Sequence, residues 1–143
     1  RAGAGGAAAG RPRLRPLLAL YAAEACLWIP ARPGDHPARD QALAFDDRRR
    51  LAERAKRMHD AQAWALVSPP PVTVRQMGPV AAWADGAGIL ATAALTVTHV
   101  RRGPAHVLHG REVLALDADQ RIAAKILVFP ELALGAPHLG WLM

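Results

Sequence analysis

The sequence predicts an α+β domain in which helices cover one side of a curved antiparallel sheet. The second half of the chain contains long segments with strand character, over residues 87–101, 105–116 and 121–129, separated by turn signals. The first half contains one long helical pattern, over residues 38–59. With 143 residues, of which 52% are apolar, the chain can bury a core of its own and is expected to form one domain.

Two short elements are predicted near the beginning. Residues 17–24 are good helix formers that follow Pro16, and proline suits the first turn of a helix. Residues 25–29 have strand character that ends at Pro30, because proline lacks the N–H that a strand ladder needs. Residues 1–16 are rich in alanine and glycine up to Gly10 and are typical of a low-complexity segment.

The longest predicted helix covers residues 38–59. One of its sides carries apolar residues and the other carries charged residues. The apolar positions are Leu43, Leu51, Ala55 and Met58, and the charged positions are Asp46, Asp47, Arg49, Arg50 and Glu53. We therefore expect this helix to lie against the sheet along its apolar side.

The remainder is predicted to be β structure. The expected strands cover residues 62–67, 72–84, 87–101, 105–116 and 121–129. A run of prolines ends the first of them, and Gly78 with Pro79 predicts a break in the second. Asp85-Gly86 predicts a tight hairpin turn, and a second turn is expected at residues 102–104. These connections make the strands antiparallel neighbours.

The final hairpin places an acidic and a basic residue close together. If residues 118–119 form a two-residue loop, Glu112 lies directly opposite Lys125. Alternation along the strands puts both on the same face as Leu114 and Leu127. The pair is then either a proton donor and acceptor in an apolar site or an ordinary cross-strand ion pair, and the sequence leaves both interpretations open.

The composition argues against several classes of function. The net charge is +6, but nearly all basic residues are arginine in a chain rich in alanine, glycine and proline, as GC-rich coding produces. No aromatic RNA-binding motif accompanies the charge, so we expect no nucleic-acid partner. The single cysteine, Cys26, allows no internal disulfide and fits the reducing cytoplasm. No apolar run is long enough to span a membrane.

Several segments resemble motifs of the nuclear transport factor 2-like superfamily, which includes ketosteroid isomerases and SnoaL-like polyketide cyclases. Residues 18–30 (LALYAAEACLWIP) resemble the end of the family's second helix and its first strand. Residues 96–103 (TVTHVRRG) and 110–122 (GREVLALDADQRI) resemble a later strand and the hairpin that follows it. Residues 128–132 (VFPEL) and 138–140 (HLG) resemble the closing segment.

The resemblance implies a cystatin-like α+β roll whose sheet wraps around helices and forms a conical pocket. It implies one SnoaL-like domain over residues 17–143, preceded in residues 1–16 by a low-complexity segment or a shortened first helix. The residues that it places along the pocket are Leu27, Ile29, Leu95, Val97, Leu114, Leu127 and Phe129. Two further departures from the family pattern are Gln120, where the hairpin has glycine, and Pro130, where the closing segment has aspartate.

The resemblance also suggests site residues. Glu112 falls where ketosteroid isomerases carry a protonated acid, whereas their base falls at Ile29 and their tyrosine on the first helix. We therefore do not expect steroid isomerisation by that mechanism. Glu112 and Lys125 are predicted to be catalytic, together with His99, which the resemblance turns toward the mouth of the pocket.

No metal and no cofactor is expected. His99, His106 and His109 are close in the sequence, but no two of them share the two-residue spacing of one strand face, and no carboxylate motif joins them.

Two functions remain open. The first is an isomerase, cyclase or hydrolase that needs no cofactor and acts on an apolar cyclic molecule by acid–base chemistry. The second is a non-catalytic binding or dimerisation module whose sheet packs an apolar face against a partner; Ile29 in place of the base favours this second function. An apolar small molecule and a second copy of the chain are the expected partners, and the cytoplasm is the expected location.

Overall fold

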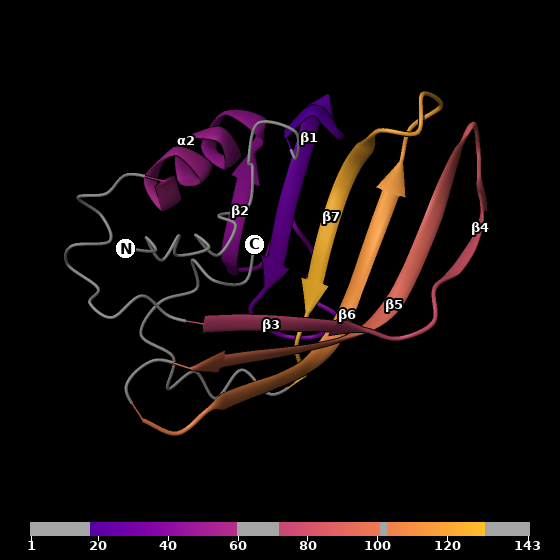
Figure 1. Cartoon of the computed structure of the whole chain (residues 1–143). Helices are drawn as coiled ribbons and strands as arrows, with labels where there is room; N and C mark the ends of the chain where they lie inside the picture. The colour runs from indigo at the N-terminus through magenta and orange to yellow at the C-terminus, as the bar shows by residue number, and fades with distance from the viewer. Residues whose placement is uncertain (1–17, 60–71, 101–102, 131–143) are drawn as a thin grey trace, which may run out of the picture.

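The computed structural model describes residues 18–59, 72–100 and 103–130 (Figure 1). These residues form a seven-stranded sheet and one helix, α2. The elements are β1 (Tyr21–Pro30), β2 (Ala42–Asp47), α2 (Arg48–His59), β3 (Val72–Met77), β4 (Ala81–Asp85), β5 (Gly88–Val100), β6 (His106–Leu116) and β7 (Ile122–Val128). The predicted α+β class is confirmed. The predicted strand at residues 62–67 lies outside the described residues, as do residues 1–16.

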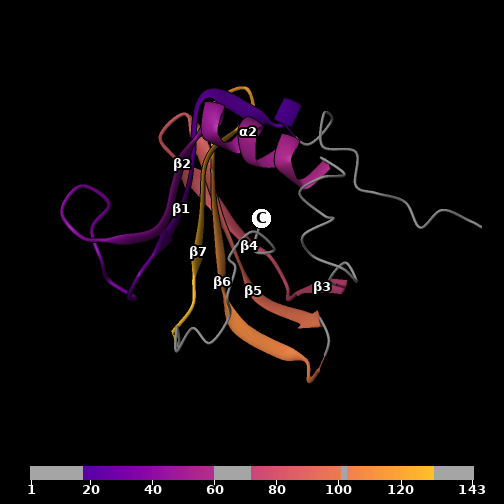
Figure 2. The ribbon, with the colours of Figure 1, turned by 90° about the vertical axis from the view of Figure 1, so that its left-hand side faces the viewer.

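The sheet is mixed. Its order is β2-β1-β7-β6-β5-β3, and β4 continues the outer edge by pairing with β5. All neighbours are antiparallel except β1 and β7, which are parallel, so the prediction of a purely antiparallel sheet is wrong at this one junction. The sheet is strongly curved and α2 lies on its concave side (Figure 2). The helix contacts β1 and β2, and Leu51 and Ala55 are the side chains that it buries.

The long helix is shorter than predicted. Residues 42–47, expected to be helical, form β2, which pairs with β1 from Cys26↔Asp47 to Pro30↔Ala42. The helix begins at Arg48, where the carboxylate of Asp47 accepts a hydrogen bond from the N–H of Arg50 at 2.7 Å. This is the geometry of a helix N-cap, so Asp47 ends the strand and starts the helix.

The predicted helix over residues 17–24 is also wrong for most of its length. Only Leu18 and Ala19 are helical among its described residues, and β1 begins at Tyr21. The N–H of Ile122 donates to the carbonyl of Leu20 at 2.8 Å, and Tyr21 pairs with Ile122. Pairing with β7 therefore overrides the helical propensity of this segment.

Two turn predictions are confirmed. The predicted strand is interrupted between β3 and β4, where the N–H of Gly78 donates to the carbonyl of Ala94 at 2.9 Å. Asp85 pairs with Gly88 across a tight turn in which Gly86 has a φ of 59°, a left-handed conformation that glycine adopts without strain.

The turn between β6 and β7 is one residue longer than predicted. The N–H of Asp117 donates to the carbonyl of Arg121 at 2.9 Å, so three residues form the loop, and Gln120 has a φ of 60°. The Asp117 side chain accepts hydrogen bonds from the N–H groups of Asp119 at 3.0 Å and Arg121 at 2.9 Å. A bulge after Ala115 moves the register further. Glu112 consequently lies opposite Leu127, not opposite Lys125.

The concave face carries the core. Its buried side chains come from β1, β5, β7 and the residue after β7, and they are Tyr21, Ala25, Leu27, Ile29, Leu95, Val97, Leu127 and Phe129, with Leu51 from α2. The alternation of side chains along the strands places Glu112 on this face, because it pairs with Ala93 on one side and Leu127 on the other. A charged group thus lies among core side chains.

Candidate functional site

The candidate site is built around Glu112 and Lys125 on the concave face. Lys125 Nζ lies 3.1 Å from Glu112 Oε1, and the two side chains are 15% and 8% exposed. Because Lys125 pairs with Leu114, the ion pair runs diagonally across β6 and β7. The sheet therefore brings the two predicted site residues together, although not in the predicted register.

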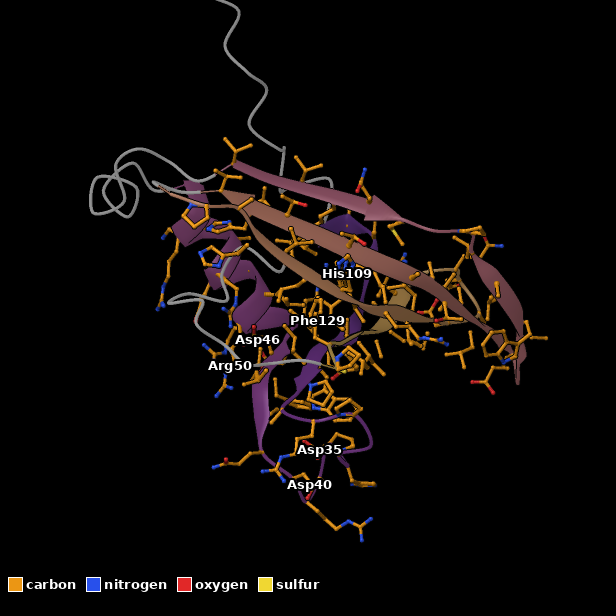
Figure 3. The ribbon with its side chains drawn as sticks, turned by 90° about the horizontal axis from the view of Figure 1, so that it is seen from below. Asp35, Asp40, Asp46, Arg50, His109 and Phe129 are labelled. Atoms are coloured by element: carbon orange, nitrogen blue, oxygen red, sulfur yellow. The ribbon has the colours of Figure 1, made fainter. Side chains whose placement is uncertain are left out.

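Gly110 and Phe129 form the boundary between this pair and the core. Gly110 pairs with Leu95 on the concave face, and a side-chain carbon at Gly110 would lie 2.5 Å from Phe129 Cδ1. The Phe129 ring therefore occupies the space above the glycine, and it is 1% exposed. Figure 3 shows Phe129 in the interior of the molecule.

Tyr21 and Arg75 also belong to the site, and the sequence interpretation missed both. Burial raises the pKa of the Tyr21 phenol, and the negative charge of Glu112 raises it further while Arg75 opposes the shift. Burial lowers the pKa of Arg75, and Glu112 and Tyr21 act in the opposite direction. Four side chains from β1, β3, β6 and β7 thus form one electrostatically coupled cluster.

Tyr21 could have been found from the sequence, because an even number of positions separates it from Ala25 and Leu27. In an extended strand it therefore lies on the same face as these two residues. This pattern is visible only if β1 is extended to its true beginning. Arg75 has no such local signal. It reaches the cluster because β3 pairs with β5, where Arg75 lies opposite Val97.

Beyond the ion pair, the concave face continues as an apolar surface that is only half-buried. We call this surface the apolar shelf, and its residues are Ile89, Ala91, Leu114 and Leu116. Leu114 connects it to the cluster, since it pairs with both Ala91 and Lys125. Ala82 and Ala84 of β4 extend it outward and are exposed. The shelf offers an organic molecule an apolar surface beside charged groups.

The seven residues predicted to line a pocket divide into two sets. Leu27, Ile29, Leu95, Val97, Leu127 and Phe129 are each 0–2% exposed, so each is almost completely covered by other protein atoms. Leu114 is the exception, because it is half-buried and belongs to the apolar shelf. The accessible part of the concave face is therefore closer to β4 than predicted.

His99 is not brought to the ion pair. It pairs with His106, six positions along β5 from the Ala93 that pairs with Glu112, which is about 20 Å at the rise of a strand. Its Nδ1 lies 3.1 Å from Thr73 Oγ1. His109 is exposed on the other face, where its Nδ1 lies 3.2 Å from Thr96 Oγ1.

A second buried carboxylate lies at the edge of the concave face. Asp46 of β2 is 6% exposed and lies beside α2 (Figure 3). Its Oδ2 is 2.5 Å from Arg54 Nη2, an ion pair that lacks the alignment of a hydrogen bond. This pair joins the helix to the sheet. In the described ranges, no three histidine, cysteine or acidic side chains converge as a metal site would require, and no helix there is long and apolar enough to cross a membrane.

Comparison with known proteins identifies the fold. No family model matches the sequence, and no curated protein matches it significantly. Among solved structures, the β subunit of benzoate 1,2-dioxygenase from Burkholderia mallei has a TM-score of 0.65 and 21% identity, with 80% of this chain and 76% of that chain covered. A protein of unknown function from Mycobacterium tuberculosis has a TM-score of 0.55 and 16% identity, with 87% and 68% covered.

An NTF2-like protein with a cystatin-like fold from Novosphingobium aromaticivorans has a TM-score of 0.50 and 15% identity, with 90% of this chain and 75% of that chain covered. Identities of this size show the fold alone. The chain therefore has the cystatin-like fold of the nuclear transport factor 2-like proteins, which the sequence motifs predicted.

Proposed function

We propose that the concave face binds a small organic molecule whose apolar body lies on the apolar shelf and whose polar group meets the Glu112–Lys125 pair. The observation that carries this proposal is the position of the pair, which is mostly buried and borders the half-buried Leu114. Burying two charges costs desolvation free energy that a hydrophobic pair would not cost. The ion pair is therefore not needed for stability, which is consistent with a role in binding.

The shape of the shelf also supports the proposal. Ala91 has Ala82 as its partner on β4 and Ala93 as the next residue on the same face of β5. These three small side chains leave space above the sheet beside Ile89 and Leu114. An apolar ring placed there would remove aliphatic surface from water, at about 25 cal/mol per Å². Ligand sites commonly combine such apolar walls with a few fixed polar groups.

A catalytic role for Glu112 and Lys125 stays a prediction. Glu112 has the position of a general acid or base, since it borders the shelf and one of its oxygens contacts Lys125 Nζ. The predicted relay through His99 is left out of the proposal, because six positions of β5 separate it from Glu112.

The experiment is a methyl NMR titration of the whole chain with a panel of small cyclic alcohols, ketones, phenols and acids. We expect at least one class to shift the methyl signals of Ile89, Leu114 and Leu116. Ala91→Phe should abolish the response by filling the shelf. Ala94→Phe, at an exposed position on the other face of β5, is the matched control and should leave it intact. No shift with any compound, or equal loss in both variants, would refute the proposal.

A second candidate function is that of a subunit in a larger assembly. The convex face carries exposed valines from three adjacent strands, which are Val72, Val74, Val100 and Val107, at 62%, 51%, 38% and 48% exposure. One similar solved structure is described as the β subunit of a dioxygenase. Apolar surface of this kind is typical of contact surfaces between proteins.

Light scattering coupled to size exclusion tests this second candidate. We expect the chain to elute as an oligomer and Val107→Lys to shift it toward the monomer. Val80→Lys, at an exposed valine between β3 and β4, is the control. A monomeric wild-type chain would count against self-assembly through the valines.

A further inference from the structure

Tyr21 and Lys125 present hydrogen-bond donors that the described part of the chain does not use. The Tyr21 side chain is 7% exposed, and within residues 18–59, 72–100 and 103–130 its hydroxyl has no hydrogen-bond partner. Lys125 Nζ has three N–H donors, and Glu112 Oε1 is its only partner within those ranges. Within those ranges Asp46 Oδ2 is the one buried side-chain nitrogen or oxygen without a partner, so neither donor is an enclosed, unpaired group.

The same carboxylate acts on both donors. Glu112 contacts Lys125 directly, and its charge also acts on the Tyr21 phenol. The raised pKa of Tyr21 keeps the phenol protonated at neutral pH, so its O–H remains a donor there. Both donors also adjoin the apolar shelf, since Tyr21 pairs with Ile122, Ile122 pairs with Leu116, and Lys125 pairs with Leu114.

We propose that the polar group of the ligand is a carboxylate, with its oxygens accepting hydrogen bonds from Tyr21 Oη and Lys125 Nζ and its apolar ring lying on the apolar shelf. This inference rests on the proposed function and names the ligand class for the same site. A carboxylate has two acceptor oxygens and can take both donors at once, and its charge strengthens both bonds. Lys125 and Arg75 supply the positive potential that offsets the like charge of Glu112.

The test is isothermal calorimetry with two probes of the same shape, cyclohexanecarboxylate and cyclohexanecarboxamide. We expect the acid to bind at least about tenfold more tightly than the amide, since a hydrogen bond to a charged group contributes more than one between neutral groups. Tyr21→Phe keeps the buried ring and should weaken the acid by about tenfold. Arg111→Met, exposed on the opposite face of β6, should leave its affinity unchanged.

Lys125→Met leaves Glu112 without its partner, so Glu112→Gln/Lys125→Met accompanies it as the variant without a buried charge. Loss of acid binding in both, with a folded far-ultraviolet spectrum, supports the inference. Equal affinity for acid and amide, or full binding by Tyr21→Phe, would overturn the carboxylate assignment while the proposed binding function stands. If neither probe binds and the NMR panel also leaves the shelf methyls unmoved, the proposed function fails with it.

Discussion

Lys125 reaches Glu112 across a diagonal of the sheet, with 3.1 Å between Nζ and Oε1, although Leu114 and Leu127 are their direct partners. A diagonal contact of this kind depends on one additional loop residue and one bulge in the β6–β7 hairpin. Relative to a hairpin with a two-residue loop and no bulge, the register is shifted by two positions, so both charges stay on the concave face. Any variant that removes one charge acts on a group that is mostly buried.

Breaking this pair should destabilise the fold. Lys125→Met leaves the Glu112 carboxylate buried without its cation, and we expect the free energy of unfolding to fall by about 3 kcal/mol. Glu112→Leu/Lys125→Met replaces both charges with apolar groups and should be near the wild type or more stable.

Urea unfolding of Glu112→Leu, Lys125→Met and the double variant Glu112→Leu/Lys125→Met measures the coupling between the charges. Additive effects of the two single changes would contradict a direct interaction across the diagonal.

The partly buried ion pair between β2 and α2 should contribute more to stability than the exposed pair on the same helix. The side chains of Arg54 and Asp46 are 33% and 8% exposed, whereas those of Arg49 and Glu53 are 68% and 51% exposed. We expect Arg54→Met to lower the free energy of unfolding by about 3 kcal/mol, and Arg49→Met to lower it by less than about 0.5 kcal/mol.

Thermal or urea unfolding of the two variants side by side provides the comparison. Equal effects would show that Asp46 does not depend on Arg54 in the folded protein.

The sequence predicted best those features that depend on neighbouring residues. The turn at Gly86 and the break at Gly78 follow from backbone preferences that act over two or three residues. The three-residue loop ending at Gln120 was missed because the left-handed conformation there falls to a residue other than glycine. This extra loop residue and the bulge after Ala115 together move Glu112 from its predicted position opposite Lys125 to a position opposite Leu127.

Features that depend on distant pairing were not predictable. Tyr21 lies in a segment with good helical propensity, and only the parallel pairing with Ile122 makes it a strand residue. Residues 42–47 carry a helical pattern of charges, yet pairing with β1 decides their conformation. Arg75 enters the site through the pairing of β3 with β5. In each case a contact across the sheet outweighs a local preference of a few tenths of a kcal/mol.

Gly110 should be intolerant of any side chain. A Cβ at this position would lie 2.5 Å from Phe129 Cδ1 and 2.5 Å from the carbonyl oxygen of Val128, and the second contact involves backbone. We expect Gly110→Ala to lower the free energy of unfolding by about 2 kcal/mol through overpacking. Gly78→Ala is the matched control, because its nearest neighbour would be Ala94 Cβ at 3.4 Å, an ordinary contact.

Denaturant midpoints and the near-ultraviolet spectrum measure both glycine variants. If Gly110→Ala were as stable as Gly78→Ala, the Phe129 ring would have to lie elsewhere than above the glycine.

Tyr21 should make the stability of the protein decrease at alkaline pH. Its pKa in the folded chain is raised above 10.0, chiefly by burial, so the unfolded chain loses the phenolic proton first. Between the unfolded and folded pKa values the native state binds more protons, and its stability falls as the pH rises, by at most about 1.4 kcal/mol per pH unit. The stabilisation is fully present below the unfolded pKa. Tyr21→Phe should remove this dependence.

The chain contains a single tyrosine, so its phenolate absorbance reports Tyr21 alone. A spectrophotometric titration should show a midpoint above 10.0 in the folded protein and a lower one in urea, because unfolding exposes the phenol to water. Coincident midpoints in the two states would mean that the Tyr21 hydroxyl is hydrated in the native protein.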